Sequence, residues 1–254
     1  MTAVSRSPPT SLPGTRSATQ QTSGEGQAPV VVVSCFSYRT SKDCAWTDAD
    51  HSIKKFVDAL KGRPVRGYGH LLVNGMPPKR QIDQETAAQA FDWFGEMAVR
   101  ILVERGVTSA LLVPVPDAGS TLSVTLCRAA ALARAVQHEG GDGFSVADVL
   151  RWDRARASAS AGGGTRSAAE LFGALRLREG CGMEAGRCVL IDDVLTTGGH
   201  LRACAAFLKL HGVLAELAIC GVKSDAEPVA DPFMERVSVL EDFAPPGRSV
   251  AEEA

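Results

Sequence analysis

Two adjacent carboxylates and a glycine-rich turn stand close together in VLIDDVLTTGGHL, residues 189–201. The apolar residues at 189–191 predict a buried strand, which places Asp192 and Asp193 at its carboxyl end. A turn follows, and after it an apolar stripe of helical spacing begins at Leu201. In an open parallel sheet, ligands bind beyond the carboxyl ends of the strands. The order of strand, carboxylates, turn and helix therefore indicates a ligand-binding edge.

The residue types at this edge suit a sugar phosphate. The first turn of a helix offers unpaired N–H groups at the positive end of the helix dipole, so it attracts phosphate. Glycines let the backbone approach the anion, and threonine hydroxyls add donors. Carboxylates would repel a phosphate, so we expect Asp192 and Asp193 to bind the hydroxyls of a ribose. The residues expected to hold its 5′-phosphate are Thr196, Thr197, Gly198, Gly199 and His200.

Two other interpretations of the aspartates are possible. Apolar residues followed by two aspartates also resemble the strand that orients Mg²⁺ in P-loop NTPases. That interpretation requires GxxxxGK[ST], whereas Gly162-Gly163-Gly164-Thr165 lacks the lysine. A solvated aspartate pair before an ordinary turn is the simpler alternative. The presence of TTGG two residues later, before a helix, favours a ligand site.

A second turn, VPVPDAGST at 113–121, follows another predicted strand and could expose N–H groups to an anion. Its candidate residues are Pro116, Asp117, Ala118, Gly119 and Ser120. Farther on, the segment 151–177 is rich in Ser, Ala and Gly and is expected not to hold one structure. Its simplest interpretation is a solvated surface loop.

The surrounding pattern predicts an α/β fold with a doubly wound parallel sheet and right-handed crossovers. Strands are expected at 30–36, 69–75, 109–116, 187–191 and 214–220. Helices are expected near 53–60 and 83–105, on the stripe Leu122, Leu126, Ala129, Ala130 and Ala133, and on the stripe Leu201, Cys204, Ala205 and Leu208. The expected organisation is a disordered tail at 1–28, an N-terminal hood region at 29–108, a core at 109–243 and a flexible tail at 244–254.

Composition narrows the function classes. The net charge of −2 and the apolar fraction of 45% suggest neither a nucleic-acid nor a membrane-surface footprint. No apolar run approaches the roughly 18–20 residues of a membrane-spanning helix. The seven cysteines are odd in number and mostly lie in apolar surroundings, which indicates reduced cysteine in a cytoplasmic protein. Cys35, Cys44 and His51 do not have the spacing of a common zinc site.

The motif VLIDDVLTTGGHL resembles the phosphoribosyl-pyrophosphate (PRPP) motif of the type I phosphoribosyltransferases, and the resemblance extends over residues 109–223. VPVP, the arginine-bearing segment and LFGALRL are most similar to the ComF-like branch. The zinc knuckle and the Arg-x-x-Asn element of that branch are missing. His200 stands where the motif usually has Thr or Ser. An imidazole there could still donate to phosphate.

The resemblance implies an enzyme that transfers phosphoribose from PRPP to a nitrogenous base and releases pyrophosphate. It implies Mg²⁺ held mainly through PRPP, with Asp192 or Asp193 as candidate ligands, and a pyrophosphate loop at residues 116–120. It also implies that residues 151–170 are a mobile loop that closes over PRPP and brings cations to the departing pyrophosphate from Arg154, Arg156 and Arg166. Members of the family are often homodimers. The catalytic set that it implies is Asp192, Asp193, Arg154, Arg156 and Arg166.

The acceptor base is not specified by any motif. It would lie under a hood built from residues 30–80 and the chain after Lys223. Four aromatic residues there could stack on a base, although packing is the simpler role for each: Phe36, Tyr38, Tyr68 and Phe233. Lys54, Lys55 and Lys61 are interpreted as a solvated helix face. The alternatives to a transferase are a regulator that senses PRPP or a nucleotide, with a protein partner for its output, and a hydrolase of a ribose-phosphate substrate.

Overall fold

The computed structural model describes residues 29–41, 43, 45–124, 127–157, 167–178, 183, 186–241, 243 and 245. The expected tail at 1–28, most of the tail at 244–254, Cys44 and Arg166 lie outside these residues. In the described chain, no helix combines the length and the apolar composition that crossing a membrane requires.

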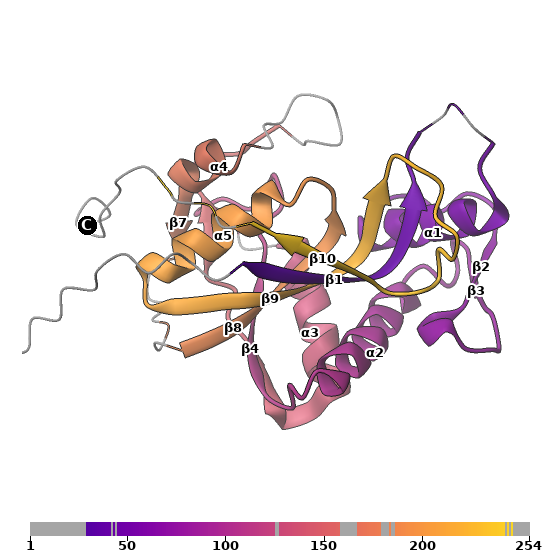
Figure 1. Cartoon of the computed structure of the whole chain (residues 1–254), viewed down its shortest axis with the longest axis horizontal. Coiled ribbons are helices and arrows are strands. Elements are labelled where there is room, and N and C mark those ends of the chain that lie inside the picture. The colour runs from indigo at the N-terminus through magenta and orange to yellow at the C-terminus, as the bar shows by residue number, and fades with distance from the viewer. Residues whose placement is uncertain are drawn as a thin grey trace, which may run out of the picture.

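The fold is an α/β structure built on one six-stranded sheet (Figure 1). The strand order is β10-β1-β9-β8-β4-β5, and all neighbouring pairs are parallel except β10 with β1. The predicted α/β class is confirmed, and the sheet is mixed rather than wholly parallel because the last strand returns antiparallel at one edge. The strands are β1 (Val30–Arg39), β4 (Ala110–Pro114), β5 (Phe144–Val146), β8 (Gly186–Leu195), β9 (Val213–Asp225) and β10 (Arg236–Leu240).

Helices cover both faces of the sheet, as the continuous apolar runs of β8 and β9 require. One core joins β1, β8 and β9 to the helices α1, α2 and α3, and a second core joins the opposite face to α4 and α5. The two cores lie on opposite faces of the sheet, so the layers are helix, sheet and helix. The helices are α1 (Asp48–Leu60), α2 (Gln89–Glu104), α3 (Arg128–Gly140), α4 (Ala168–Ala174) and α5 (Gly199–Leu210).

The first strand belongs to this sheet. β1 pairs with β9 along most of its length, with Val33 opposite Ile219 in register. Residues 29–108 therefore contribute one strand to the sheet, which is buried between β9 and β10. The small elements outside the sheet include β2 (Gly69–Leu71), η1 (Val73–Gly75), β3 (Arg80–Ile82) and η2 (Gly141–Gly143).

Three predicted elements are shorter than expected. The strand at 69–75 ends at Leu71, because Asn74 adopts a left-handed turn with φ of 59°. The helix at 83–105 begins only at Gln89, because the Asp83 carboxylate accepts backbone N–H bonds that fold the preceding residues into a turn. The helix expected from Leu122 begins at Arg128, and Leu122 is an exposed turn residue.

Much of the segment expected to be loose is ordered. β6 (Leu150–Trp152) pairs antiparallel with β7 (Leu175–Leu177), and α4 precedes β7. The prediction was wrong for these residues because Trp152, Leu171 and Phe172 are buried in the second core, which fixes both ends of the segment. Residues 158–166 lie outside the described chain.

The described cysteines are core residues, as predicted. Cys35, Cys127, Cys188, Cys204 and Cys220 are all free and buried. Burial raises the pKa of the Cys35 and Cys188 thiols to about 12, so both are neutral and unreactive at physiological pH.

Candidate functional site

A cavity of about 420 Å³ lies where the carboxyl ends of β4 and β8 meet. These strands are neighbours in the sheet, so the segments that follow them are brought together, as expected for a parallel sheet. The end of α1 and the segment after β6 close the cavity from two further sides. Its polar and aromatic lining consists of Lys61, Arg63, Asp117, Arg128, Trp152, Arg156, Asp192, Asp193, Thr196 and His200.

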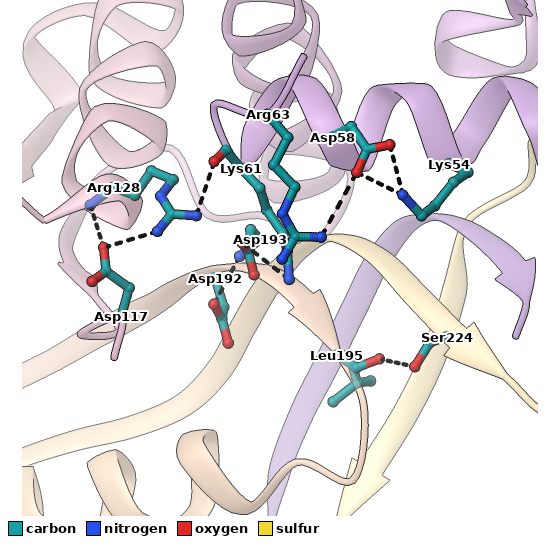
Figure 2. Close-up of polar contacts among 10 residues, drawn as sticks. All are labelled: Lys54, Asp58, Lys61, Arg63, Asp117, Arg128, Asp192, Asp193, Leu195 and Ser224. Atoms are coloured by element: carbon teal, nitrogen blue, oxygen red, sulfur yellow. Dashed lines mark hydrogen bonds and ion pairs between the residues drawn. The ribbon is translucent and has the colours of Figure 1, made fainter. Parts of the chain in front are cut away.

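The two aspartates lie within β8 rather than beyond it. The strand continues to Leu195, and Asp192 pairs in register with Cys220 of β9. Successive side chains of a strand point to opposite sides. Figure 2 accordingly shows Asp193 directed toward Lys61 and Asp192 directed away from it. The Asp193 N–H donates to Asp192 Oδ1 at 2.8 Å, which fixes the first carboxylate against the strand.

Lys61 is the cationic partner of this pair. It is the C-cap residue of α1, and its Nζ lies 3.6 Å from Asp193 Oδ2. The prediction of a solvated lysine face was wrong for Lys61, whose side chain is only 16% exposed. Helical periodicity could not show this contact, because the residue lies where the helix ends and the chain turns toward the sheet.

The ionised form of the Asp192 carboxyl is disfavoured in the folded protein. Burial raises the pKa of its carboxyl well above the ordinary value of 3.8, the adjacent Asp193 raises it further, and Lys61 partly offsets both effects. Lys61 thus offsets part of the negative charge of both carboxylates, which lie in a partly dehydrated site. A ligand that donates hydrogen bonds to them, or brings a cation, would stabilise the ionised pair.

The turn at 116–120 is organised by Asp117. Its Oδ1 accepts from the Gly119 N–H at 2.9 Å and its Oδ2 from the Arg128 N–H at 3.0 Å. Its carbonyl accepts from the Ser120 N–H at 2.9 Å. The expectation that Gly119 and Ser120 present free N–H groups to an anion is therefore wrong, because both groups are used within the turn. Asp117 fixes the conformation of this turn, and nearby cationic side chains supply the positive charge on this side of the cavity.

Two arginines stand beside this turn. Arg128 begins α3, donates to the Lys61 carbonyl at 3.1 Å and lies 3.8 Å from Asp117 (Figure 2). The Arg156 guanidinium lies over the Trp152 ring at 5.3 Å, and its backbone N–H donates to the Ala118 carbonyl at 2.9 Å. The structure thus brings Arg156 to the cavity. Arg154 is exposed and does not line it.

The expected phosphate loop lies at another side of the cavity, with Thr196 and His200 in its lining. Thr197 is exposed outside the lining, and Gly199 is buried as the first residue of α5. His200 packs edge-on against Trp152 with ring centroids 5.8 Å apart. The residue that departs from the usual motif therefore contacts the same indole as Arg156.

Gly198 is required by the backbone at the start of α5. Its φ is 75°, and a Cβ atom there would lie 2.6 Å from the Leu240 methyl groups of β10. We expect Gly198→Ala to lower the free energy of unfolding by about 1–3 kcal/mol, measured by urea denaturation. Gly62→Ala is the matched control, because Gly62 has φ of 62° and a Cβ atom added there would meet no atom within 4 Å. The larger loss should belong to Gly198→Ala, and equal losses would show that Leu240 exerts no constraint.

Four of the polar and aromatic lining residues were not recognised as site residues from the sequence. Lys61 and Arg63 come from the end of α1, Arg128 from the start of α3, and Trp152 from β6. Only Trp152 had a local signal, because it stands at the start of the arginine-bearing segment. The others are distant in sequence from both recognised turns, and the sheet brings them together.

The donor set suits Mg²⁺ only in combination with ligand oxygens. The described residues contain no group of three or more His, Cys, Asp or Glu side chains that could hold a metal. Mg²⁺ in phosphate-handling sites usually has one or two carboxylates, with substrate oxygens and water completing its shell. Asp192 and Asp193 provide that number of carboxylates.

Comparisons with known proteins were made for the whole chain. No family model matches it. The chain is 35% identical over 78 residues to an orotate phosphoribosyltransferase from Nocardioides, which is 30% of this chain and 44% of that enzyme. The chain therefore matches less than half the length of this curated relative.

A solved structure was also found, that of adenine phosphoribosyltransferase from Trypanosoma brucei in complex with AMP, pyrophosphate and ribose-5-phosphate. The match has 14% sequence identity and a TM-score of 0.35, and it covers 84% of this chain and 93% of that one. The sequence similarity over 78 residues relates part of this chain to a phosphoribosyltransferase.

Proposed function

We propose that this protein is a phosphoribosyltransferase that uses PRPP and transfers its phosphoribosyl group to a nitrogenous base. The observation that carries the proposal is the shared cavity. It combines an adjacent carboxylate pair, the start of α5 and four cationic side chains: Lys61, Arg63, Arg128 and Arg156. The segment similar to orotate phosphoribosyltransferase supports the same class. VPVP and LFGALRL support the ComF-like branch within it.

Each part of PRPP has a matching group of residues in the lining of the cavity. Asp192 and Asp193 would accept hydrogen bonds from the two ribose hydroxyls. Thr196, with the first N–H groups of α5, would hold the 5′-phosphate, and His200 would add an imidazole donor. Arg128 and Arg156 would face the pyrophosphate. A chelated Mg²⁺, held on PRPP and by Asp192 or Asp193, would neutralise part of the phosphate charge.

The reaction follows from this placement. The C1′–O bond of PRPP breaks and its electron pair leaves with pyrophosphate, while the acceptor nitrogen forms the new bond to C1′ and releases its proton to pyrophosphate or water. Arg128 and Arg156 would stabilise the negative charge that develops on the leaving group. Fixing the ribose through both aspartates would hold C1′ in line between nucleophile and leaving group. No covalent enzyme intermediate is required.

The test is calorimetric titration of PRPP with Mg²⁺ into wild type and into Asp192→Asn/Asp193→Asn. We expect binding in wild type and at least about a hundredfold weaker binding in the variant, because two charge-assisted hydrogen-bond acceptors are lost. Asp142→Asn is the control, since Asp142 is an exposed carboxylate on η2 outside the cavity.

Turnover then separates the three function classes. Pyrophosphate release that requires a base identifies a transferase, and release in water alone identifies a hydrolase. Tight binding without release identifies a sensor. Failure of wild type to bind PRPP would overturn the proposal.

A further inference from the structure

A second hollow, of about 350 Å³, lies beside α1 and the segment that follows it. We call it the α1 hollow. It is separate from the cavity that holds the aspartates, but Arg63 lines both. Its lining consists of His51, Lys54, Lys55, Asp58, Arg63, Pro64 and Arg66.

The charge of the α1 hollow is strongly positive. Four permanent cations face one carboxylate, Asp58. Both oxygens of Asp58 lie 2.6 Å from Lys54 Nζ, and Arg63 lies 3.8 Å from Asp58 (Figure 2). Among the carboxylates that the structure describes, neither Lys55 nor Arg66 has an ion-pair partner. The hollow therefore has cations in excess of its own anion.

The lining selects a class of ligand. Among the lining residues that the structure describes, Pro64 alone is apolar, so an apolar molecule would gain little by binding. Lysine and arginine together offer the donors that phosphate and carboxylate groups accept. The hollow adjoins the end of α1, where the helix dipole is negative and disfavours anions. Anion binding there would therefore depend on the side-chain cations.

We propose that the α1 hollow binds an oxyanion, namely a phosphate or carboxylate group of a small molecule. Because Arg63 lines both hollows, an oxyanion bound here lies next to the proposed PRPP site. That oxyanion has two sources: a charged group on the acceptor base, or a separate effector. The proposal of an oxyanion site is supported by the charges and the shape of the α1 hollow. The link between that oxyanion and the acceptor base rests on the proposed function.

The experiment titrates inorganic phosphate into isotopically labelled protein and follows the backbone amide signals. In wild type, phosphate is expected to shift the signals of Lys55, Arg63 and Arg66. In Lys55→Ala/Arg66→Ala, affinity at these signals should fall at least about tenfold. The variant Lys79→Ala/Arg134→Ala removes the same charge from exposed positions outside both hollows and should bind like wild type. Shifts confined to residues 196–200, or equal affinity in both variants, would overturn the proposal.

A second arm identifies the source of the oxyanion, with uracil and its 6-carboxylate, orotate, as probes. If orotate displaces phosphate from the α1 hollow and uracil does not, the anion belongs to the acceptor. If neither displaces phosphate, while phosphate changes the affinity for PRPP in wild type more than in Lys55→Ala/Arg66→Ala, the anion is a separate effector. If PRPP fails to bind wild type while phosphate still shifts the α1 signals, the proposed function fails and the oxyanion site stands.

Discussion

Asp192→Asn is expected to stabilise the fold at neutral pH while it weakens PRPP binding at least about tenfold, because one charge-assisted hydrogen-bond acceptor is lost. The native carboxylate is half-buried beside Asp193, and its partial burial and the neighbouring charge both raise its pKa. An amide of nearly the same shape removes the charge and keeps an oxygen that can accept the Asp193 N–H. We expect a gain of about 0.5–2 kcal/mol in the free energy of unfolding, the range of single stabilising substitutions.

The raised pKa of Asp192 determines how the gain in stability from Asp192→Asn varies with pH. Because the pKa of Asp192 is higher in the folded protein, the fold binds this proton more tightly than the unfolded chain does. The contribution of Asp192 to stability therefore falls as pH rises from its ordinary value of 3.8 through the raised value. The gain from Asp192→Asn should be absent below about pH 3.8 and should grow with pH until the native carboxyl is fully ionised.

Urea denaturation of both proteins between pH 3 and 8 measures this difference. Subtracting the two profiles is necessary because other carboxylates act in the opposite direction. Burial opposes ionisation of Asp50, but hydrogen bonds from Thr47 and Arg39, together with the Arg39 charge, outweigh it and lower the pKa, so its stabilising contribution is lost in acid. That contribution is common to both proteins and cancels. A variant that is less stable than wild type at pH 7, or a gain that does not vary with pH, would contradict the prediction.

The parts of the site that could be predicted from the sequence are those encoded in short segments. The apolar run before Asp192 and the glycines after Thr196 each have a local physical reason, since a buried strand needs apolar residues and a left-handed turn needs Gly198. Their neighbours in the alternating pattern of strands and helices then indicated the α/β class. The pattern of a short segment was sufficient for a correct prediction wherever a single strand, helix or turn determined the geometry of the site.

The remainder depends on contacts between distant segments. Lys61 reaches Asp193 from a remote part of the chain, and no periodicity in α1 indicates that contact. β10 joins the sheet antiparallel as an edge strand, and its alternating exposure does not reveal which strand it pairs with. The expected free N–H groups of Gly119 and Ser120 are occupied because Asp117 turns back on its own loop. Composition predicted a loose segment at 151–177, but it could not show that Trp152 anchors the segment.

Trp152→Ala is expected to lower the free energy of unfolding by about 3–5 kcal/mol, the cost typical of removing a buried tryptophan. Trp152 is fully buried in the second core. It also joins several parts of the site. Its indole N–H donates to the Asp117 carbonyl and its backbone N–H to the Ser120 carbonyl, both at 2.8 Å. Its ring contacts His200 and Arg156.

Trp152→Phe separates the two roles, because phenylalanine keeps most of the apolar packing and lacks the indole donor. Losing one hydrogen bond and leaving the Asp117 carbonyl without that partner should cost about 1–3 kcal/mol of stability. The affinity for PRPP should fall at least about tenfold, since the turn at 116–120, Arg156 and His200 would no longer share one rigid contact. Calorimetric titration at a temperature where the variant remains folded measures the affinity.

Trp93→Phe is the matched control for this comparison. Trp93 is also buried and lies under the Arg80 guanidinium at 5.9 Å, but it belongs to α2 and does not line the cavity. It should lose stability without losing affinity for PRPP. If both phenylalanine variants bind PRPP like wild type, Trp152 serves packing alone, and the walls of the cavity are positioned independently of each other. If only Trp152→Phe weakens binding, one indole sets the relative position of the pyrophosphate wall and the phosphate loop.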